Sequence, residues 1–170
     1  SYDALIGRYN SELANGLGNL IHRSLSMLKR YRNGIVPNRS DELAGEVNAT
    51  VAKTIDLLRD CQLQTGLETI WSLIDRANQY VDQTKPFNLA KDPAQAERLD
   101  AVLYNLAETC RVLAALLVPY LPATAERIYR QLGFLQPPDQ LAAAAWGGLT
   151  PGHVIGEVAP LFPRRDTPAR

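Results

Sequence analysis

Residues 8–32 read RYNSELANGLGNLIHRSLSMLKRYR, and their apolar side chains recur with the period of an α-helix. When the residues are placed at steps of about 100°, one sector collects six large side chains. They are Leu13, Leu17, Leu20, Met27, Leu28 and Tyr31. We therefore expect one helix from roughly Tyr2 to Arg32 with this sector against a core. It should end at Asn33-Gly34, a typical C-terminal signal.

The rest of the chain shows further helical periodicity and no alternating strand pattern. We expect four more helices, over 40–64, 67–83, 92–118 and 122–132, and a short element between 138 and 145. Ser40 should cap the first of these helices, and Gly66 should break the chain after it. Asp92 before Pro93 should cap the third, and Gly133 should end the fourth. The short connections favour an all-α antiparallel bundle.

The C-terminal part, from Trp146 on, is rich in proline and glycine and cannot form a regular helix. It nevertheless carries many apolar residues: Leu149, Val154, Ile155, Val158, Leu161 and Phe162. We expect this tail to pack back on the bundle. Residues 1–133 are then the bundle and 134–170 a short helix and tail, one domain overall.

The composition is that of an ordinary globular protein, with 46% apolar and 21% charged residues in 170. Eighteen basic and eighteen acidic residues cancel, so nucleic-acid binding would need a local patch.

Cys61 and Cys110 lie far apart and are expected to be buried, reduced thiols. With neither a signal peptide nor an apolar run of about 20 residues, we expect a cytoplasmic protein with no membrane partner. Because the chain begins with Ser1, we expect a piece of something longer.

Catalytic chemistry has little support in the sequence. The two histidines, His22 and His153, have no metal-ligand spacing and no nearby nucleophile. A glycine-rich phosphate loop is missing, as is the Glu-x-x-His pair of di-metal bundle enzymes. We therefore expect no catalytic residue, metal or cofactor in this chain, although a bundle enzyme using a carboxylate or histidine stays an alternative.

The side of the first helix opposite its apolar sector carries amides, an imidazole and guanidinium groups. These residues are Asn15, Asn19, His22, Arg23, Ser26 and Arg30. Amides can hydrogen-bond base edges as donor and acceptor, and arginine can bind phosphate or stack on a base. This pattern indicates an RNA-binding face, and the alternative is a plain solvated surface.

The loop 85–91 is a second candidate. Phe87 follows Pro86, so we expect an extended backbone there, and Lys85 and Lys91 flank the ring. An aromatic between cations is typical of a single-stranded RNA site, where it stacks on an unpaired base. The alternative is that Phe87 fills the core beneath the loop.

Several stretches together resemble the anticodon-binding domain of methionyl-tRNA synthetases, in order and spacing over essentially the whole chain. They are 8–15, 17–23, 25–27, 77–82, 85–87, 89–92, 103–108, 119–122, 146–149 and 160–163. The resemblance implies a helix bundle of the class I synthetase type that recognises the CAU anticodon of initiator and elongator methionine tRNAs.

The resemblance also implies roles for single residues. Asn19 and Arg23 match the asparagine and arginine that meet the anticodon bases. Phe87 after Pro86 matches an aromatic that stacks on the first anticodon base, and Asp82 matches an acid that disfavours wrong anticodons.

Two positions depart from the family pattern. Phe87 stands where tryptophan is usual, which keeps a stacking face but reduces its area and removes the indole donor. His22 stands where asparagine is common.

The family's ATP-binding signatures, resembling His-Ile-Gly-His and Lys-Met-Ser-Lys-Ser, do not occur in this sequence. The resemblance therefore implies that ATP, magnesium and the activation of methionine belong to an N-terminal catalytic domain of the parent chain. The alternative function is a structural or protein-interaction bundle, derived from a synthetase, that no longer binds tRNA.

Overall fold

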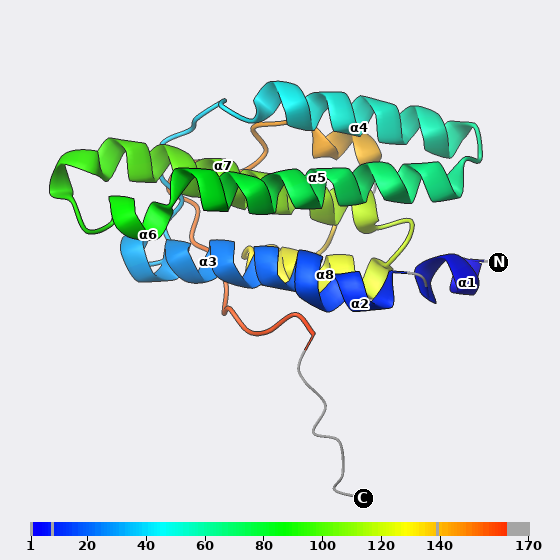
Figure 1. The fold of residues 1–170 in the computed structure, drawn as a ribbon, viewed down its shortest axis with the longest axis horizontal. Coiled ribbons are helices and arrows are strands. Elements are labelled where there is room, and N and C mark those ends of the chain that lie inside the picture. Colours follow the sequence, from blue (N-terminus) through cyan, green and yellow to red (C-terminus); the bar gives the residue numbers. More distant parts are fainter. Residues whose placement is uncertain (1, 8, 139, 163–170) are drawn as a thin grey trace, which may run out of the picture.

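A computed structural model describes residues 2–7, 9–138 and 140–162 of the chain. Its helices, with π-helical η1 and 3-10 helical η2 and η3, are α1 (Tyr2–Gly7), α2 (Asn10–Glu12), η1 (Leu13–Gly18), α3 (Asn19–Arg32), α4 (Ala44–Arg59), α5 (Leu63–Thr84), α6 (Pro86–Leu89), η2 (Pro93–Gln95), α7 (Ala96–Leu117), α8 (Pro122–Gln131) and η3 (Leu141–Ala144). The long helices lie alongside one another and alternate in direction (Figure 1), which confirms the all-α antiparallel bundle.

Within the described ranges, β pairing is limited to one isolated bridge between Ile35 and Val154. None of the helices described there has the length and apolarity needed to cross a bilayer.

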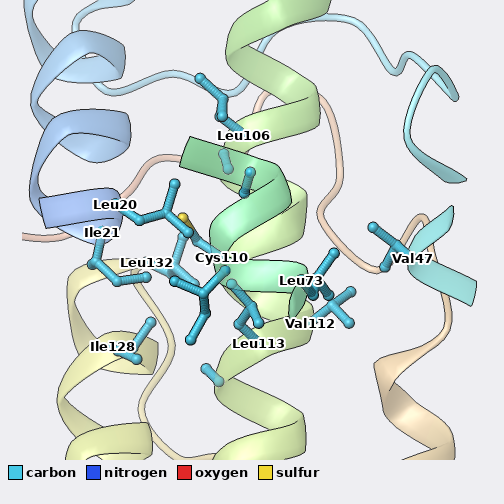
Figure 2. Close-up of a cluster of buried hydrophobic side chains, with 14 of the residues drawn as sticks. Leu20, Ile21, Val47, Leu73, Leu106, Cys110, Val112, Leu113, Ile128 and Leu132 are labelled. Atoms are coloured by element: carbon cyan, nitrogen blue, oxygen red, sulfur yellow. The ribbon is translucent and has the colours of Figure 1, made fainter. Parts of the chain in front are cut away.

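Helix α7 is the centre of the core, because from Val102 to Leu117 every side chain on it is buried. In Figure 2, Cys110 and Leu113 of α7 lie beside Leu20 of α3 and Ile128 of α8. Burying a leucine or isoleucine contributes about 1.5–3 kcal/mol, so helices on several sides of α7 are held to it.

The opening helix is less regular than the sequence predicts. Instead of one helix over 2–32, a π-helical turn, η1, separates α2 from α3. Leu17, Leu20 and Leu28 are fully buried as expected, whereas Leu13 and Met27 pack at the edge of the core. Asn33 then adopts the left-handed conformation, which confirms the expected end of α3.

Ser40 does not cap the second helix, so that prediction is wrong. The α4 helix begins only at Ala44, and buried Asn105 of α7 takes over the capping role. Its Oδ1 accepts from the backbone N–H of Leu43 at 2.9 Å, and its Nδ2 donates to Ser40 Oγ at 2.8 Å. A cap supplied from another helix cannot be recognised in local sequence.

Gly66 does not break a helix either, because it lies inside α5. A Cβ at this position would lie 2.5 Å from the Tyr120 hydroxyl, which donates to the carbonyl of Leu63 at 2.7 Å. Glycine is therefore required for the approach of Tyr120. The break falls instead at Cys61, with φ of 57°, and its side chain is exposed rather than buried as expected.

The expected caps further along the chain are confirmed. Asp92 accepts a hydrogen bond from the backbone N–H of Ala94 at 3.0 Å and leads into η2 and α7. Gly133 follows α8 with φ of 88°, and η3 lies where a short element was expected.

The tail packs on the bundle over its described part, as predicted. Trp146, Leu149, Ile155 and Leu161 are buried, whereas Val154 is 59% exposed. Residues 163–170 of the predicted tail lie outside the described residues.

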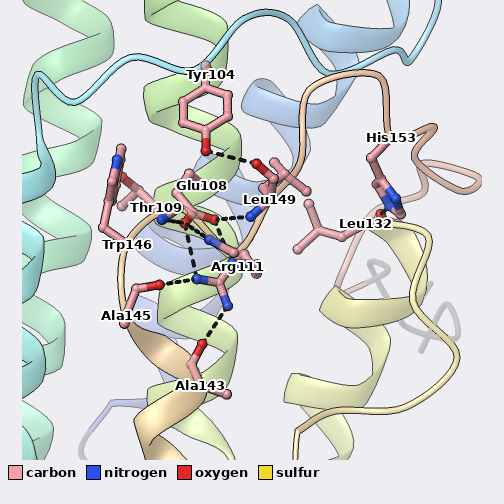
Figure 3. A network of polar contacts seen from close by, with 12 residues as sticks. Tyr104, Glu108, Thr109, Arg111, Leu132, Ala143, Ala145, Trp146, Leu149 and His153 are labelled. Carbon is pink, nitrogen blue, oxygen red and sulfur yellow. Dashed lines mark hydrogen bonds and ion pairs between the residues drawn. The ribbon is translucent and has the colours of Figure 1, made fainter.

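A buried ion pair on α7 holds the start of the tail (Figure 3). Arg111 Nε donates to Glu108 at 2.5 Å, and this carboxylate also accepts from the backbone N–H groups of Gly147, Gly148 and Leu149. The guanidinium donates in turn to the carbonyls of 143 and 145. Both charges are thus hydrogen-bonded several times, which is the condition under which a buried pair is tolerated.

Candidate nucleic-acid interface

Two of the expected site residues meet across helices α3 and α5. Arg23 Nη2 lies 3.2 Å from Asp82 Oδ1, with the two side chains 41% and 73% exposed. They are 59 positions apart in sequence, so only the folded bundle brings them together. The charge of Arg23 is therefore matched by a carboxylate at the surface.

Asn19 and Asn15 lie on the same exposed face, about one and two turns before Arg23. The Nδ2 of Asn19 donates to the backbone carbonyl of Asn15 at 2.8 Å. This contact lies at the end of η1, whose wider turn loosens the helix between the two residues. Such π-helical turns occur frequently at functional sites.

A groove of about 550 Å³ runs between this face and α5. Asn15, Asn19 and Arg23 line it on one side, and Asp75 and Asn78 line it on the other. The groove therefore joins three residues expected from the sequence with others that were not assigned to the site.

The polar face of the first helix alone does not indicate the α5 side of the groove, which includes Trp71, Asp75 and Asn78. Trp71, Asp75, Asn78 and Asp82 follow one another at spacings of four, three and four residues, which places them on one face of α5. That spacing is visible in the sequence and would have indicated a second helix face.

His22 lies beside the groove rather than in it. Its side chain is exposed and lines a smaller hollow of about 110 Å³ together with Asn19 and the end of the tail, Pro160 to Phe162. The tail therefore borders the polar face of α3.

Phe87 lies on a one-turn helix, α6, so the expected extended backbone is wrong. Lys85 precedes it in the left-handed conformation, with φ of 48°, and Pro86 occupies the first helical position. Proline there has a suitable φ and no N–H to satisfy, which allows the chain to turn into α6. Pro86 is buried, but the Phe87 ring is 48% exposed, which contradicts the core-filling alternative.

The groove and Phe87 differ in chemistry. The groove lining includes the carboxylates of Glu12, Glu68 and Asp75, and its guanidinium, on Arg23, is already paired with Asp82. Such a surface suits the polar edge of a neutral base better than a phosphate. Phe87 offers an exposed ring for stacking, with Lys85 as a neighbouring cation.

The comparisons with known proteins show the family to which the chain belongs. Residues 41–152 match the model of the anticodon-binding domain of tRNA ligase. The chain is 39% identical to the methionine–tRNA ligase of Fusobacterium nucleatum, over 96% of this chain, and 37% identical to that of Caldanaerobacter subterraneus, over 98%. It spans 27% of the length of each of these relatives.

A solved structure gives the same result. Mycobacterium tuberculosis methionyl-tRNA synthetase in complex with methionyl-adenylate superposes with a TM-score of 0.79 at 36% identity, covering 95% of this chain and 33% of that one. The chain belongs to the family of anticodon-binding domains of tRNA ligases and is the anticodon-binding domain of the methionyl-tRNA synthetase type.

Proposed function

We propose that this chain recognises the CAU anticodon of initiator and elongator methionine tRNAs. The observation that carries the proposal is that Arg23, which pairs with Asp82, lines one groove together with Asn19. An amide can read donor and acceptor positions of a base, and a guanidinium can bind a base or phosphate nearby.

Phe87, which is not among the residues that line the groove, supplies a separate stacking surface. Its ring is half exposed on α6, the element that directly follows the helix carrying Asp82. Stacking on an unpaired base is tolerant of sequence, so Phe87 contributes affinity while Asn19 contributes discrimination.

The chain supplies specificity through binding, and the chemistry belongs to the rest of the parent protein. The parent is proposed to be a cytoplasmic methionine–tRNA ligase that uses ATP with magnesium in an N-terminal catalytic domain. Anticodon binding then places the acceptor end of the tRNA in that domain, so that recognition energy is used in the reaction.

A mobility shift with the 170-residue chain tests the proposal. Methionine tRNA should be retarded at concentrations where a transcript with a replaced anticodon is not. Equal retardation of both RNAs, or of neither, would instead support a structural bundle that does not read the anticodon.

A further inference from the structure

The Phe162 ring of the C-terminal tail packs directly against Gly18, the last residue of the π-helical turn η1. A Cβ on Gly18 would lie 3.2 Å from Cδ2 of Phe162, a closer approach than a side chain at this position would normally tolerate. The same Cβ would lie 3.2 Å from the carbonyl oxygen of Leu13, the first residue of η1. Glycine therefore allows both the wide turn and the contact of the tail with it.

Helix α8 holds the ring in this place from the other side. Gln131 Nε2 donates to the carbonyl of Ala159 at 3.1 Å, and the guanidinium of Arg127 lies 5.8 Å from the centroid of the Phe162 ring. Leu161, next to Phe162, is buried in the core. The contact between the ring and Gly18 is thus a fixed part of the packing between the tail and the bundle.

The π-helical turn in turn determines what the Asn19 side chain does. The backbone N–H of Asn19 bonds to the carbonyls of Ala14 and Gly16. In an α-helix it would bond to the carbonyl of Asn15, four residues back. That carbonyl instead accepts the side-chain amide of Asn19 at 2.8 Å. The wide turn therefore fixes the amide that is proposed to read the anticodon.

We propose that Phe162 is a positioning residue for anticodon recognition, which acts through Gly18 and η1 on Asn19. Because π-helical turns are rare, residues 13–18 need tertiary contacts to keep this backbone rather than that of a continuous α-helix. In the α-helical form, the backbone N–H of Asn19 would take the Asn15 carbonyl and release the side-chain amide. The inference rests on the proposed function, in which Asn19 reads a base.

The side-chain amide resonances of Asn19, assigned by their loss in Asn19→Ala, test the coupling in the free chain. Phe162→Ala should shift them, because the hydrogen bond to Asn15 is released. Phe134→Ala is the matched control, because Phe134 is also a partly buried aromatic at the tail and stacks on His153 with centroids 4.7 Å apart. It does not line the hollow beside Gly18, so Phe134→Ala should leave the Asn19 resonances in place.

Stem-loop titrations test the effect on recognition. Phe162→Ala should reduce the ratio of cognate to anticodon-swapped affinities about tenfold, within the range for one lost base contact. Phe162→Leu, which keeps an apolar contact with Gly18, should retain most of the ratio. Gly18→Ala should lose about as much as Phe162→Ala. Because both changes act on one contact, the double variant should also lose about tenfold rather than the roughly hundredfold of independent effects.

Four outcomes would overturn the inference. Unmoved Asn19 resonances in folded Phe162→Ala show that the ring does not maintain the turn; if this variant does not fold, Gly18→Ala carries the same prediction. An equal loss of discrimination in Phe134→Ala means that any loosening of the tail has this effect. Multiplied losses in the double variant mean that the two residues act separately. If the resonances move but Phe162→Ala discriminates like the parent, the positioning role fails and the proposed function stands; if the parent itself does not discriminate, both fail.

Discussion

Arg23 of α3 and Asp82 of α5 are joined by an ion pair of 3.2 Å at the edge of the groove, with both side chains partly open to solvent. An exposed pair of this kind contributes only about 0–1 kcal/mol to stability. The pair therefore sets the charge and orientation of the guanidinium rather than holding the helices together.

Asp82→Asn should reduce discrimination between anticodons. Without the carboxylate, stem-loops with wrong anticodons should bind about tenfold more tightly, since a repulsive element against them is lost. Asp56→Asn is the matched control, because Asp56 is 72% exposed and pairs with Arg59 on α4. An unchanged ratio of cognate to non-cognate affinities in Asp82→Asn would show that this carboxylate takes no part in selection.

Phe87→Ala should weaken binding of the cognate stem-loop by about 1–3 kcal/mol, the usual effect of removing one base–aromatic stack. Because the ring is 48% exposed, the loss of folding stability should stay well below the roughly 3–5 kcal/mol of a fully buried phenylalanine. Titration calorimetry and thermal melting separate the two effects. Leu135→Ala, at a residue that is 90% exposed, controls for removal of an apolar surface group. Equal affinity of Phe87→Ala and the parent would remove Phe87 from the site.

Glu108→Gln should destabilise the fold strongly, because it leaves buried Arg111 without its counter-charge. Breaking a buried pair in this way costs about 3–5 kcal/mol. Urea denaturation measures the loss, and Glu126→Gln, in an exposed pair with Arg130, should change stability by less than about 1 kcal/mol. Matching midpoints for the two variants would mean that the Glu108 network does not hold the tail.

The two cysteines should react very differently with a thiol reagent. Cys61 is exposed and should be labelled in the native chain, whereas Cys110 should react only after unfolding.

Burial raises the pKa of the Cys110 thiol from 9.0 to about 12. The unfolded thiol therefore loses its proton at lower pH than the folded one, and stability should fall as pH rises from about 9 to 12. A Cys110→Ala chain should show a smaller decrease over this window; an equal decrease would exclude Cys110 as a cause.

Much of the bundle could be predicted because its signals are local. The apolar period of α3, the Asn33-Gly34 stop, and Asp92 before Pro93 each involve neighbouring residues, and each prediction is confirmed. The failures share a different cause. Asn105, rather than Ser40, caps the start of α4, and Gly66 is required because the Tyr120 hydroxyl packs closely against it. Asn105 and Tyr120 both lie far away in sequence from the residues they contact.

The candidate site divides in the same way. The polar face with Asn15, Asn19 and Arg23 follows from helical periodicity alone. The pairing of Arg23 with Asp82 depends on how α3 and α5 pack, so sequence spacing cannot show it. The one-turn helix at Phe87 depends on the left-handed backbone of Lys85, a conformation that lysine seldom adopts.

Titration of cognate and anticodon-swapped stem-loops at several salt concentrations, with the parent, Asn19→Ala and Arg23→Ala chains, tests the central proposal most directly. Asn19→Ala should lose about 1–3 kcal/mol of discrimination per base read, because the amide reads donor and acceptor positions. Arg23→Ala should weaken binding and, where the guanidinium meets phosphate, lower the salt slope by about 1. Both variants should stay folded, since these side chains lie on the surface of α3. If both folded variants bind and discriminate like the parent, this face is ordinary solvated surface and the anticodon is not read there.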